Sequence, residues 1–181
     1  MQTLDFGKDY FHIFGLAVDY RVDENLLKAR QRQLQAEFHP DLFVNASDQV
    51  KRLSVQQAAH VNEAYQTLLN PVSRAKYLLE INGLESSDES ETTSDTEFLM
   101  EQLAYREALE QCRDDSDPLT CCDKILDSLE ARAGRLADEF VEKLNTADLG
   151  SAREVSRKMQ FVQRIREQAT ELQYELEDQL A

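Results

Sequence analysis

The stretch Phe38-His39-Pro40-Asp41 decides how the first half of this chain folds. Proline has no backbone N–H to donate and disfavours the helical conformation of the residue before it, so Pro40 is expected to end a helix near Phe38 or His39. One face of that helix is expected to be buried. It carries Leu27, Leu34 and Phe38, which lie close together when each residue turns the helix by about 100°. His39 and Asp41 are therefore predicted to stand at a rigid corner.

A second helix is predicted to begin a few residues after the corner, with Ser47 as its N-cap. Its inward stripe at helical spacing consists of Val50, Leu53, Gln57, Val61, Ala64 and Leu68. Because the connection is so short, the sequence predicts a helical hairpin that displays His39, Pro40 and Asp41 at its tip.

Capping residues predict where the other helices of this half begin and end. Asp23 can N-cap the helix that runs to Phe38. Residues 9–17 are expected to form a short helix whose aromatic side chains cap the hairpin. Asn70 and Pro71 are an N-cap and a first-turn proline, and they start a further helix that Gly83 closes.

These motifs, in this order, resemble those of a J-domain. They are Asp9-Tyr10-Phe11, Phe14-Gly15-Leu16, His39-Pro40-Asp41, Asn62-Glu63-Ala64-Tyr65, Pro71 and Arg74. The resemblance implies that the tip and one face of the preceding helix meet the ATPase of a DnaK-type chaperone. That face is a basic strip of Lys28, Arg32 and Gln35, about 100 to 140° around the helix from the buried face. Spacing alone would describe this strip as an ordinary solvated surface.

No catalytic or metal constellation accompanies His39 and Asp41 in the sequence. An acid–base pair needs a nucleophile, oxyanion donors or a metal in a concave site, and nothing near the corner supplies them. His12, His39 and His60 are 27 and 21 residues apart, without the spacing of metal ligands. We expect the chain to be no enzyme and to carry no cofactor or metal, and Asp41 to offer a fixed carboxylate to another protein.

Composition bounds the class of protein and its partners. The 181 residues are 41% apolar and 30% charged, which is typical of a soluble chain with one or two small domains. Residues 1–83 carry 10 acidic and 9 basic side chains, whereas residues 84–181 carry 25 and 11. The acidic second half argues against nucleic acid or an anionic membrane and favours a protein partner.

Location and redox state are predicted from what the sequence lacks. There is no apolar run long enough to span a membrane and no secretory signal, so we expect a cytoplasmic protein. The three cysteines are odd in number and two of them are adjacent, which suits neither a disulfide framework nor a zinc site. We therefore interpret Cys112, Cys121 and Cys122 as reduced thiols on helices.

The second half is predicted to be a three-helix bundle over residues 96–181, so the whole chain is all-α. It follows a J-domain over residues 1–83 and an acidic linker rich in Ser and Thr over residues 84–95. The middle helix begins at Asp117-Pro118 and buries Cys122, Ile125, Leu126, Leu129, Ala133, Leu136 and Phe140. The last helix buries Val155, Met159, Val162, Ile165, Ala169, Leu172, Leu176 and Leu180.

The first helix of the bundle differs because it has two apolar faces. One face carries Phe98, Tyr105, Ala108, Leu109 and Cys112, and the other carries Leu99, Met100 and Leu103. Two apolar faces need two partners. One partner is the rest of the bundle, and the other is the J-domain, a wider core or a second protein.

The order of J-domain, short linker and helical bundle, together with three further motifs, resembles the HscB family of J-protein co-chaperones of iron-sulfur cluster biogenesis. The motifs are Phe98-Leu99-Met100-Glu101-Gln102-Leu103, Arg106-Glu107 and Arg157-Lys158-Met159-Gln160-Phe161. Leu42 stands where a lysine is common, and Gln31 where an aromatic is common. No cysteine-pair zinc module precedes the J-domain, so the form resembles the bacterial one.

The resemblance implies two docking surfaces. The scaffold protein IscU would contact Leu99, Met100, Leu103 and Phe161, with a weaker polar contact from Glu107. HscA, a specialised DnaK-type ATPase, would contact His39, Pro40 and Asp41 together with Lys28 and Arg32. Phe161 lies at the edge of its apolar stripe, so we expect it to be partly exposed. The chain would stimulate HscA and deliver IscU to it.

Two alternatives stay open. The chain could be a structural helical protein that associates with itself through Leu99, Met100 and Leu103, or a J-protein with another client. Self-association through these three residues expects a dimer, whereas the co-chaperone interpretation expects a monomer, so sedimentation separates these two.

Overall fold

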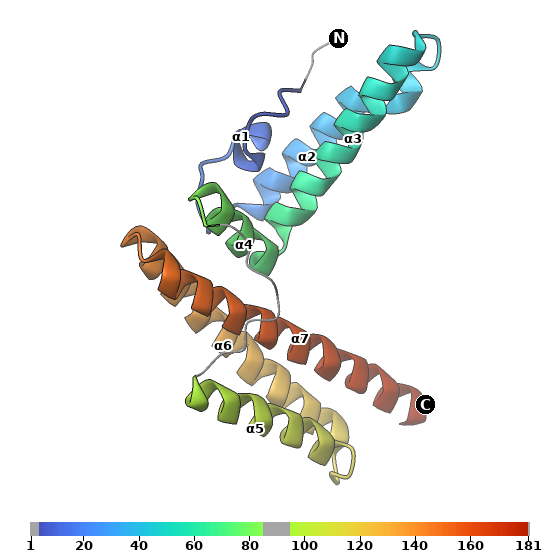
Figure 1. Cartoon of the computed structure of the whole chain (residues 1–181). Helices are drawn as coiled ribbons and strands as arrows, with labels where there is room; N and C mark the ends of the chain where they lie inside the picture. The colour runs from blue at the N-terminus through green and yellow to red at the C-terminus, as the bar shows by residue number, and fades with distance from the viewer. Residues whose placement is uncertain (1–3, 85–94, 181) are drawn as a thin grey trace. The chain divides into compact units, whose positions relative to one another are not determined.

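The computed structural model describes residues 4–84 and 95–180, and within these ranges it contains helices and no strands. The first compact unit ends at Leu84 and contains α1 (Tyr10–Phe14), α2 (Glu24–Phe38), the short 3-10 helix η1 (Pro40–Phe43), α3 (Asp48–Leu69) and α4 (Pro71–Ile81). The second contains α5 (Thr96–Cys112), α6 (Pro118–Asn145) and α7 (Leu149–Leu180) (Figure 1). The predicted all-α fold is confirmed. Residues 85–94 of the predicted linker lie outside the described residues.

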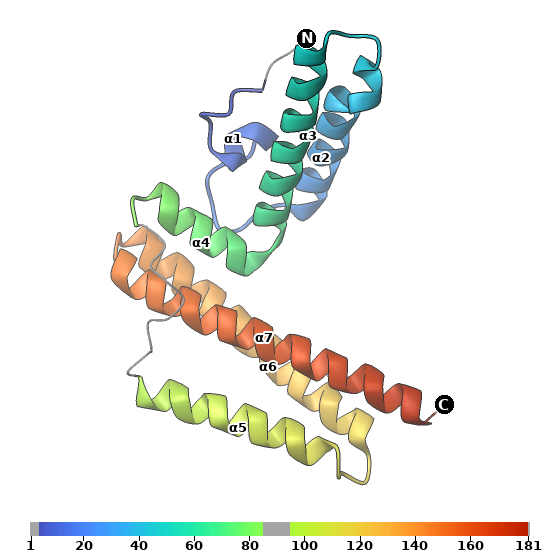
Figure 2. The same ribbon diagram turned by 45° about the vertical axis from the view of Figure 1, so that its right-hand side comes forward.

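The hairpin of α2 and α3 forms as predicted. The Asp23 carboxylate accepts from the backbone N–H groups of Asn25 and Leu26 at 2.9 and 3.0 Å, and Ser47 caps α3. The two helices lie side by side with α1 against them in Figures 1 and 2. The core of this unit is made by Phe11, Phe14, Tyr20, Leu27, Phe38, Val61, Ala64, Leu68, Ala75, Leu78 and Leu79. Leu34, Val50 and Leu53 are only half-buried.

The first helix is shorter than the predicted 9–17. The Asp9 side chain accepts from the N–H of His12 at 2.9 Å and starts α1, and Gly15 ends it at φ 64°. That left-handed conformation is open to glycine without strain and stops the helix. The prediction of a helix through residue 17 is therefore wrong, because Gly15 acts as its C-cap.

Arg74 on α4 ties this unit together from inside. It is buried, and its guanidinium donates to the carbonyls of Leu68 at 2.6 Å, Tyr20 at 2.7 Å and Leu69 at 3.2 Å. The same group lies 5.6 Å from the centroid of the Tyr20 ring. Burial lowers the pKa of Arg74 from its ordinary value. One side chain thus holds the end of α3 to the segment before α2.

Replacing Arg74 with methionine is expected to destabilise the first unit by about 2–4 kcal/mol, because the buried carbonyls of Leu68 and Tyr20 lose their donors. Methionine keeps most of the apolar stem, so the loss reports the hydrogen bonds. Urea unfolding followed by circular dichroism measures it. Arg30→Ala on the exposed face of α2 is the control and should change stability by less than about 0.5 kcal/mol. A loss of similar size in both variants would contradict this role.

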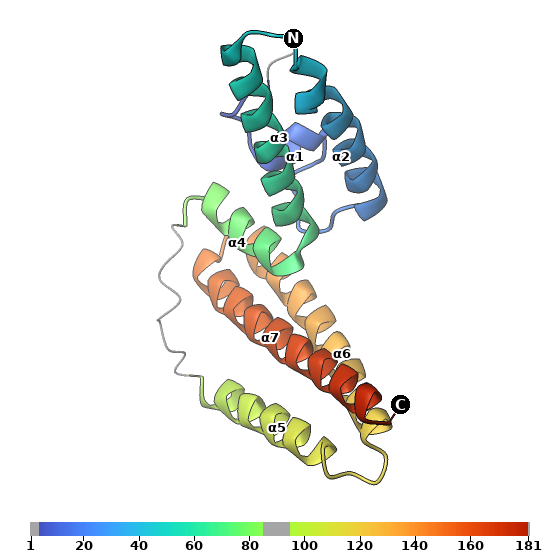
Figure 3. The ribbon, with the colours of Figure 1, turned by 90° about the vertical axis from the view of Figure 1, so that its right-hand side faces the viewer.

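The second unit is built on α6 and α7, which pack along their length, with α5 alongside (Figure 3). The predicted inward stripes are buried at Cys122, Ile125, Leu129, Leu136, Phe140, Val155, Met159, Val162, Ile165, Ala169, Leu172 and Leu176. Leu126 and Ala133 are half-buried, and the side chain of Leu180 lies outside the described ones. The α6 start at Asp117-Pro118 is confirmed.

The interpretation of the cysteines as three reduced thiols is wrong. Cys112 and Cys121 are joined by a disulfide, and only Cys122 is a free, buried thiol. The reason is the tight turn between α5 and α6, which places the last residue of one helix and the first turns of the next at a Cα–Cα separation of 5.5 Å. This separation suits a disulfide, and a count of cysteines does not reveal it.

Candidate functional site

The tip of the hairpin is a fixed polar corner. α2 ends at Phe38, His39 adopts an extended conformation (φ −58°, ψ 126°), and Pro40 begins η1. The N–H of Asp41 donates to Nδ1 of His39 at 3.3 Å, and the N–H of Leu42 donates to the His39 carbonyl at 3.0 Å. The backbone and the imidazole therefore hold each other, which fixes the conformation of the corner in the free chain.

The two titratable side chains of the corner face solvent. The Asp41 side chain is 84% exposed and that of His39 57%, and Oδ2 of Asp41 lies 3.6 Å from Nδ1 of His39. Nδ1 accepts the Asp41 N–H, so the neutral imidazole carries its proton on Nε2. The corner thus presents a carboxylate as acceptor and an imidazole N–H as donor.

The predicted basic strip of α2 is solvent-facing. Arg32 and Gln35 are exposed, and Lys28 is half-buried, with its ammonium 3.4 Å from Glu24. That exposed pair contributes little to stability. Lys28 and Arg32 therefore present positive charge to solvent on this face of α2.

Apolar side chains flank the corner on its C-terminal side. Leu42 directly follows Asp41 and is 65% exposed, and Val44, the C-cap of η1, is 60% exposed. Leu42 occupies the position where the J-domain pattern commonly has a lysine. The corner therefore carries an exposed apolar side chain where that pattern has a positive charge.

The second candidate surface is the apolar patch of α5, defined by Leu99, Met100 and Leu103. Their exposed fractions are 43%, 62% and 49%, whereas Phe98, Leu109 and Cys112 on the other face are buried. Glu107 is also exposed. The prediction of two apolar faces is confirmed, and within the described residues only one of them is covered.

Three contacts hold the N-terminal half of α5 in place. Nζ of Lys158 lies 2.7 Å from Oδ2 of Asp95, the N-cap of the helix. The guanidinium of Arg132 donates to both carboxylate oxygens of Glu101 at 2.7 and 3.0 Å. Phe98 packs edge-on against Phe161 at 5.4 Å between ring centroids. Periodicity did not single out Arg132 or Lys158, because a helix pattern does not show which partner lies opposite.

The expectation that Phe161 is partly exposed is wrong. Only 7% of its surface is exposed, because its ring is covered by Phe98 of α5. Phe161 therefore supports α5 from beneath. A direct contact of Phe161 with a scaffold stays a prediction.

The Asp95–Lys158 pair predicts how acid affects α5. The side-chain hydrogen bond from Lys158 and the backbone N–H of Phe98 lower the pKa of Asp95 below 3.8. The ionised form is favoured by folding, so its stabilisation is present above the ordinary pKa and is lost as pH falls through the folded pKa. Wild type should melt at a higher temperature than Asp95→Asn at neutral pH. This difference should shrink as pH falls below the ordinary carboxyl pKa, and it should vanish only below the lowered pKa of Asp95 in the folded chain.

Asparagine can still cap the helix, so the comparison isolates the charge. The control is Asp114→Asn in the exposed turn after α5, which should leave the pH dependence of the melting temperature unchanged. A difference between wild type and Asp95→Asn that persists in acid would contradict the assignment.

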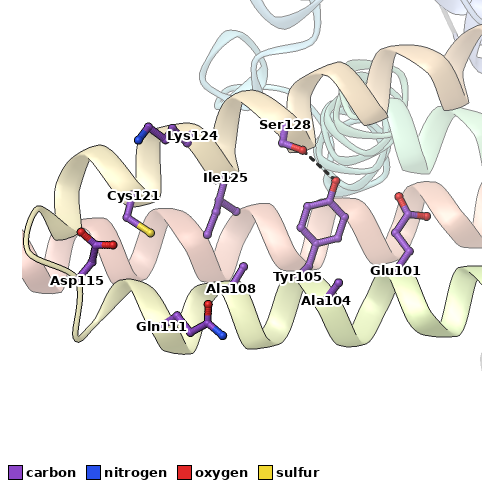
Figure 4. Close-up of a pocket in the computed structure, with 10 residues that line it drawn as sticks. All are labelled: Glu101, Ala104, Tyr105, Ala108, Gln111, Asp115, Cys121, Lys124, Ile125 and Ser128. Atoms are coloured by element: carbon purple, nitrogen blue, oxygen red, sulfur yellow. Dashed lines mark hydrogen bonds between the residues drawn. The ribbon is translucent and has the colours of Figure 1, made fainter.

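A cavity of about 450 Å³ lies between α5 and α6 (Figure 4). The small side chains of Ala104 and Ala108 leave it open, and Tyr105 bridges it with a 3.2 Å hydrogen bond to Ser128. Among the described residues, no group of three His, Cys, Asp or Glu is placed to hold a metal. No helix within the described ranges has the length and apolarity to cross a bilayer.

Comparison with known proteins matches both halves of the chain. Residues 94–170 match the family model of the HSCB C-terminal oligomerisation domain. The co-chaperone protein HscB homolog of Shewanella halifaxensis is 42% identical over 174 residues, which cover 94% of this chain and 99% of that protein.

Solved structures agree in fold. The chaperone HscB from Vibrio cholerae is 34% identical with a TM-score of 0.83, covering 96% of this chain and 100% of that one. Human co-chaperone protein HscB is 30% identical with a TM-score of 0.84, covering 94% and 84%.

The hairpin with its exposed His39-Pro40-Asp41 corner, followed by a separate helical unit, defines a J-protein co-chaperone. The sequence identity of 42% over 94% of the chain narrows this class to one family. The chain belongs to the HscB family.

Proposed function

We propose that this chain stimulates the ATPase of an HscA-type chaperone and delivers an IscU-type scaffold to it, in support of iron-sulfur cluster assembly and transfer. The observation that carries the proposal is the presence of two exposed surfaces on separate compact units of one chain. These are the polar corner on the first unit and the apolar patch of α5 on the second. Two sites on one chain raise the effective concentration of scaffold near the chaperone.

The corner is the proposed chaperone-docking surface. The fixed carboxylate of Asp41 is suited to a charge-assisted hydrogen bond with an arginine or backbone donor of the partner. Lys28 and Arg32 of α2 add attraction to an acidic surface and set the approach. Leu42 and Val44 supply apolar contact beside them.

The apolar patch of α5 is the proposed scaffold-docking surface. Leucine and methionine are flexible apolar residues that adapt to a partner. Glu107 borders this patch with a carboxylate, and Phe161 holds α5 in place from beneath through Phe98. A scaffold with an apolar groove or stripe fits this surface.

The chain itself is proposed to catalyse no reaction and to work in the cytoplasm, without a cofactor of its own. Its action is mechanical coupling. Hydrolysis occurs in the chaperone, and closing of the chaperone on the scaffold follows.

Single-turnover ATP hydrolysis by an HscA-type chaperone tests the proposal. Adding the full chain should accelerate hydrolysis, and adding scaffold should accelerate it further. A folded chain that leaves the rate unchanged would contradict the proposed function.

Self-association is a second candidate, favoured by the matched description of the C-terminal region as an oligomerisation domain and by the exposed patch of α5. Sedimentation velocity at micromolar concentration tests it. The proposed co-chaperone role expects a monomer. A dimer that dissociates when Leu99, Met100 and Leu103 become serine would establish self-association through this patch.

A further inference from the structure

Three cysteines meet where α5 turns into α6. Cys112 is the last residue of α5, and Cys121 and Cys122 lie in the first turns of α6. Cys112 and Cys121 form a disulfide with a Cα–Cα separation of 5.5 Å, whereas Cys122 is free and buried. The separation lies inside the range of about 4.4–6.8 Å that disulfides need, so both helices keep their regular geometry.

The two bonded cysteines differ in accessibility. Cys112 has no exposed surface, whereas Cys121 is half-buried and lines the cavity between α5 and α6. Figure 4 shows Cys121 at one end of that cavity, near Asp115, with Glu101 at the other end. A small reagent can therefore approach Cys121 from the cavity, and Cys112 is reached through Cys121.

The cavity also explains what the disulfide does for α5. The ion pairs Asp95–Lys158 and Glu101–Arg132 anchor the N-terminal half of the helix. The cavity borders α5 from Glu101 to Gln111, and Ala104 and Ala108 contribute only small side chains to its wall. The covalent link at Cys112 joins the C-terminal end of α5 to α6 beyond these small residues.

We propose that Cys112 and Cys121 form a reversible dithiol–disulfide site that reacts with a small thiol–disulfide couple of the glutathione class and that fixes the C-terminal half of α5 to α6. This inference goes beyond the co-chaperone role and does not depend on it.

The oxidation proceeds by two exchanges. The thiolate of Cys121, its proton released to solvent, attacks one sulfur of the small disulfide, forms a mixed disulfide and expels one small thiolate. The thiolate of Cys112 then attacks Sγ of Cys121, forms the protein disulfide and expels the second small thiolate. The two cysteines lose two electrons and two protons, and the small disulfide becomes two thiols.

Reduction reverses these steps from the cavity side. A small thiolate attacks Sγ of Cys121 and releases Cys112, and a second thiolate frees Cys121 from the mixed disulfide. Burial, followed by the charge of Asp123, raises the pKa of the neighbouring Cys122, which keeps that thiol protonated and a poor competitor.

Thiol counting on the full chain tests the site. The reduced protein is equilibrated with mixtures of reduced and oxidised glutathione, quenched in acid, alkylated in denaturant and analysed by mass spectrometry with peptide mapping. We expect two thiols to disappear together as the mixture becomes oxidising. Peptide mapping should find Cys112 joined to Cys121, and Cys122 should remain a free thiol that is alkylated at every ratio. Three alkylated thiols at every ratio, or a disulfide that includes Cys122, would overturn the proposal.

Matched variants sharpen the result. Cys122→Ala should keep the two-thiol transition, whereas Cys112→Ser should stop at a single glutathione adduct on Cys121. A Cys121→Ser variant should form no adduct at Cys112 in the folded chain, because Cys112 is buried. An adduct at Cys112 as readily formed as that at Cys121 would overturn the proposed order of attack.

Hydrogen exchange tests the structural effect. Amides of residues 104–112 should exchange roughly tenfold faster in the reduced protein than in the oxidised one, because the closed loop restrains opening. The doubly substituted Cys112→Ser, Cys121→Ser chain should behave like the reduced protein in both buffers. Equal exchange in reduced and oxidised wild type would contradict the role of the link in fixing α5.

Discussion

Replacing Asp41 with asparagine is expected to abolish stimulation of the chaperone ATPase while leaving scaffold affinity unchanged. Asparagine has the same shape and loses the charge, so the charge-assisted hydrogen bond to the partner is lost and the partner group stays unpaired. That loss costs about 2–5 kcal/mol, which is a reduction of at least about thirtyfold in productive docking. Single-turnover hydrolysis with a titration of the variant measures it.

The matched control is Asp48→Asn. Asp48 is an exposed carboxylate in the first turn of α3, on the same hairpin, so the net charge changes equally. Stimulation by this variant should stay within about twofold of wild type because a single exposed charge outside the His39-Pro40-Asp41 corner contributes little. Equal loss in both variants would show that net charge, and not the corner, drives docking.

Removing the apolar patch of α5 is expected to have the opposite effect to Asp41→Asn: scaffold affinity is lost and stimulation of the chaperone ATPase is kept. The triple substitution Leu99→Ser, Met100→Ser and Leu103→Ser takes away three side chains that each contribute about 1 kcal/mol or more in a docked interface, so scaffold affinity should fall about 100-fold. Calorimetric titration with scaffold measures the affinity. Stimulation of the chaperone in the absence of scaffold should be unchanged.

Tyr174→Ser is the control for this variant. Tyr174 is exposed on α7 of the same unit and lies outside the proposed surface. Its replacement should leave scaffold affinity unaltered. If Tyr174→Ser weakened binding as much as the triple variant, the scaffold would be docking on another face.

The helix pattern predicted much of this structure because the signals are local. Pro40 stops α2 through its own ring, and Asp23, Ser47 and Asn70 cap their helices with their own side chains. The two faces of α5 also follow from spacing alone. Burial of one face and exposure of Leu99, Met100 and Leu103 agree with that expectation.

The features that the sequence did not predict depend on what lies across from a residue. A spacing of 100° per residue puts Phe161 at the edge of a stripe, and only the position of Phe98 determines that its ring is covered. The Glu101–Arg132 pair joins residues 31 positions apart. The Cys112–Cys121 disulfide depends on the tightness of one turn, which the odd count of cysteines obscured.

The proposed coupling of scaffold to chaperone requires both proposed docking surfaces on one chain. Single-turnover ATP hydrolysis tests it with chaperone and scaffold present and the co-chaperone at submicromolar concentration. Wild type is compared with an equimolar mixture of Asp41→Asn and the triple patch variant. The mixture supplies both surfaces on separate chains, so it is expected to lack the scaffold-dependent acceleration of wild type. A mixture as fast as wild type would contradict coupling through a single chain.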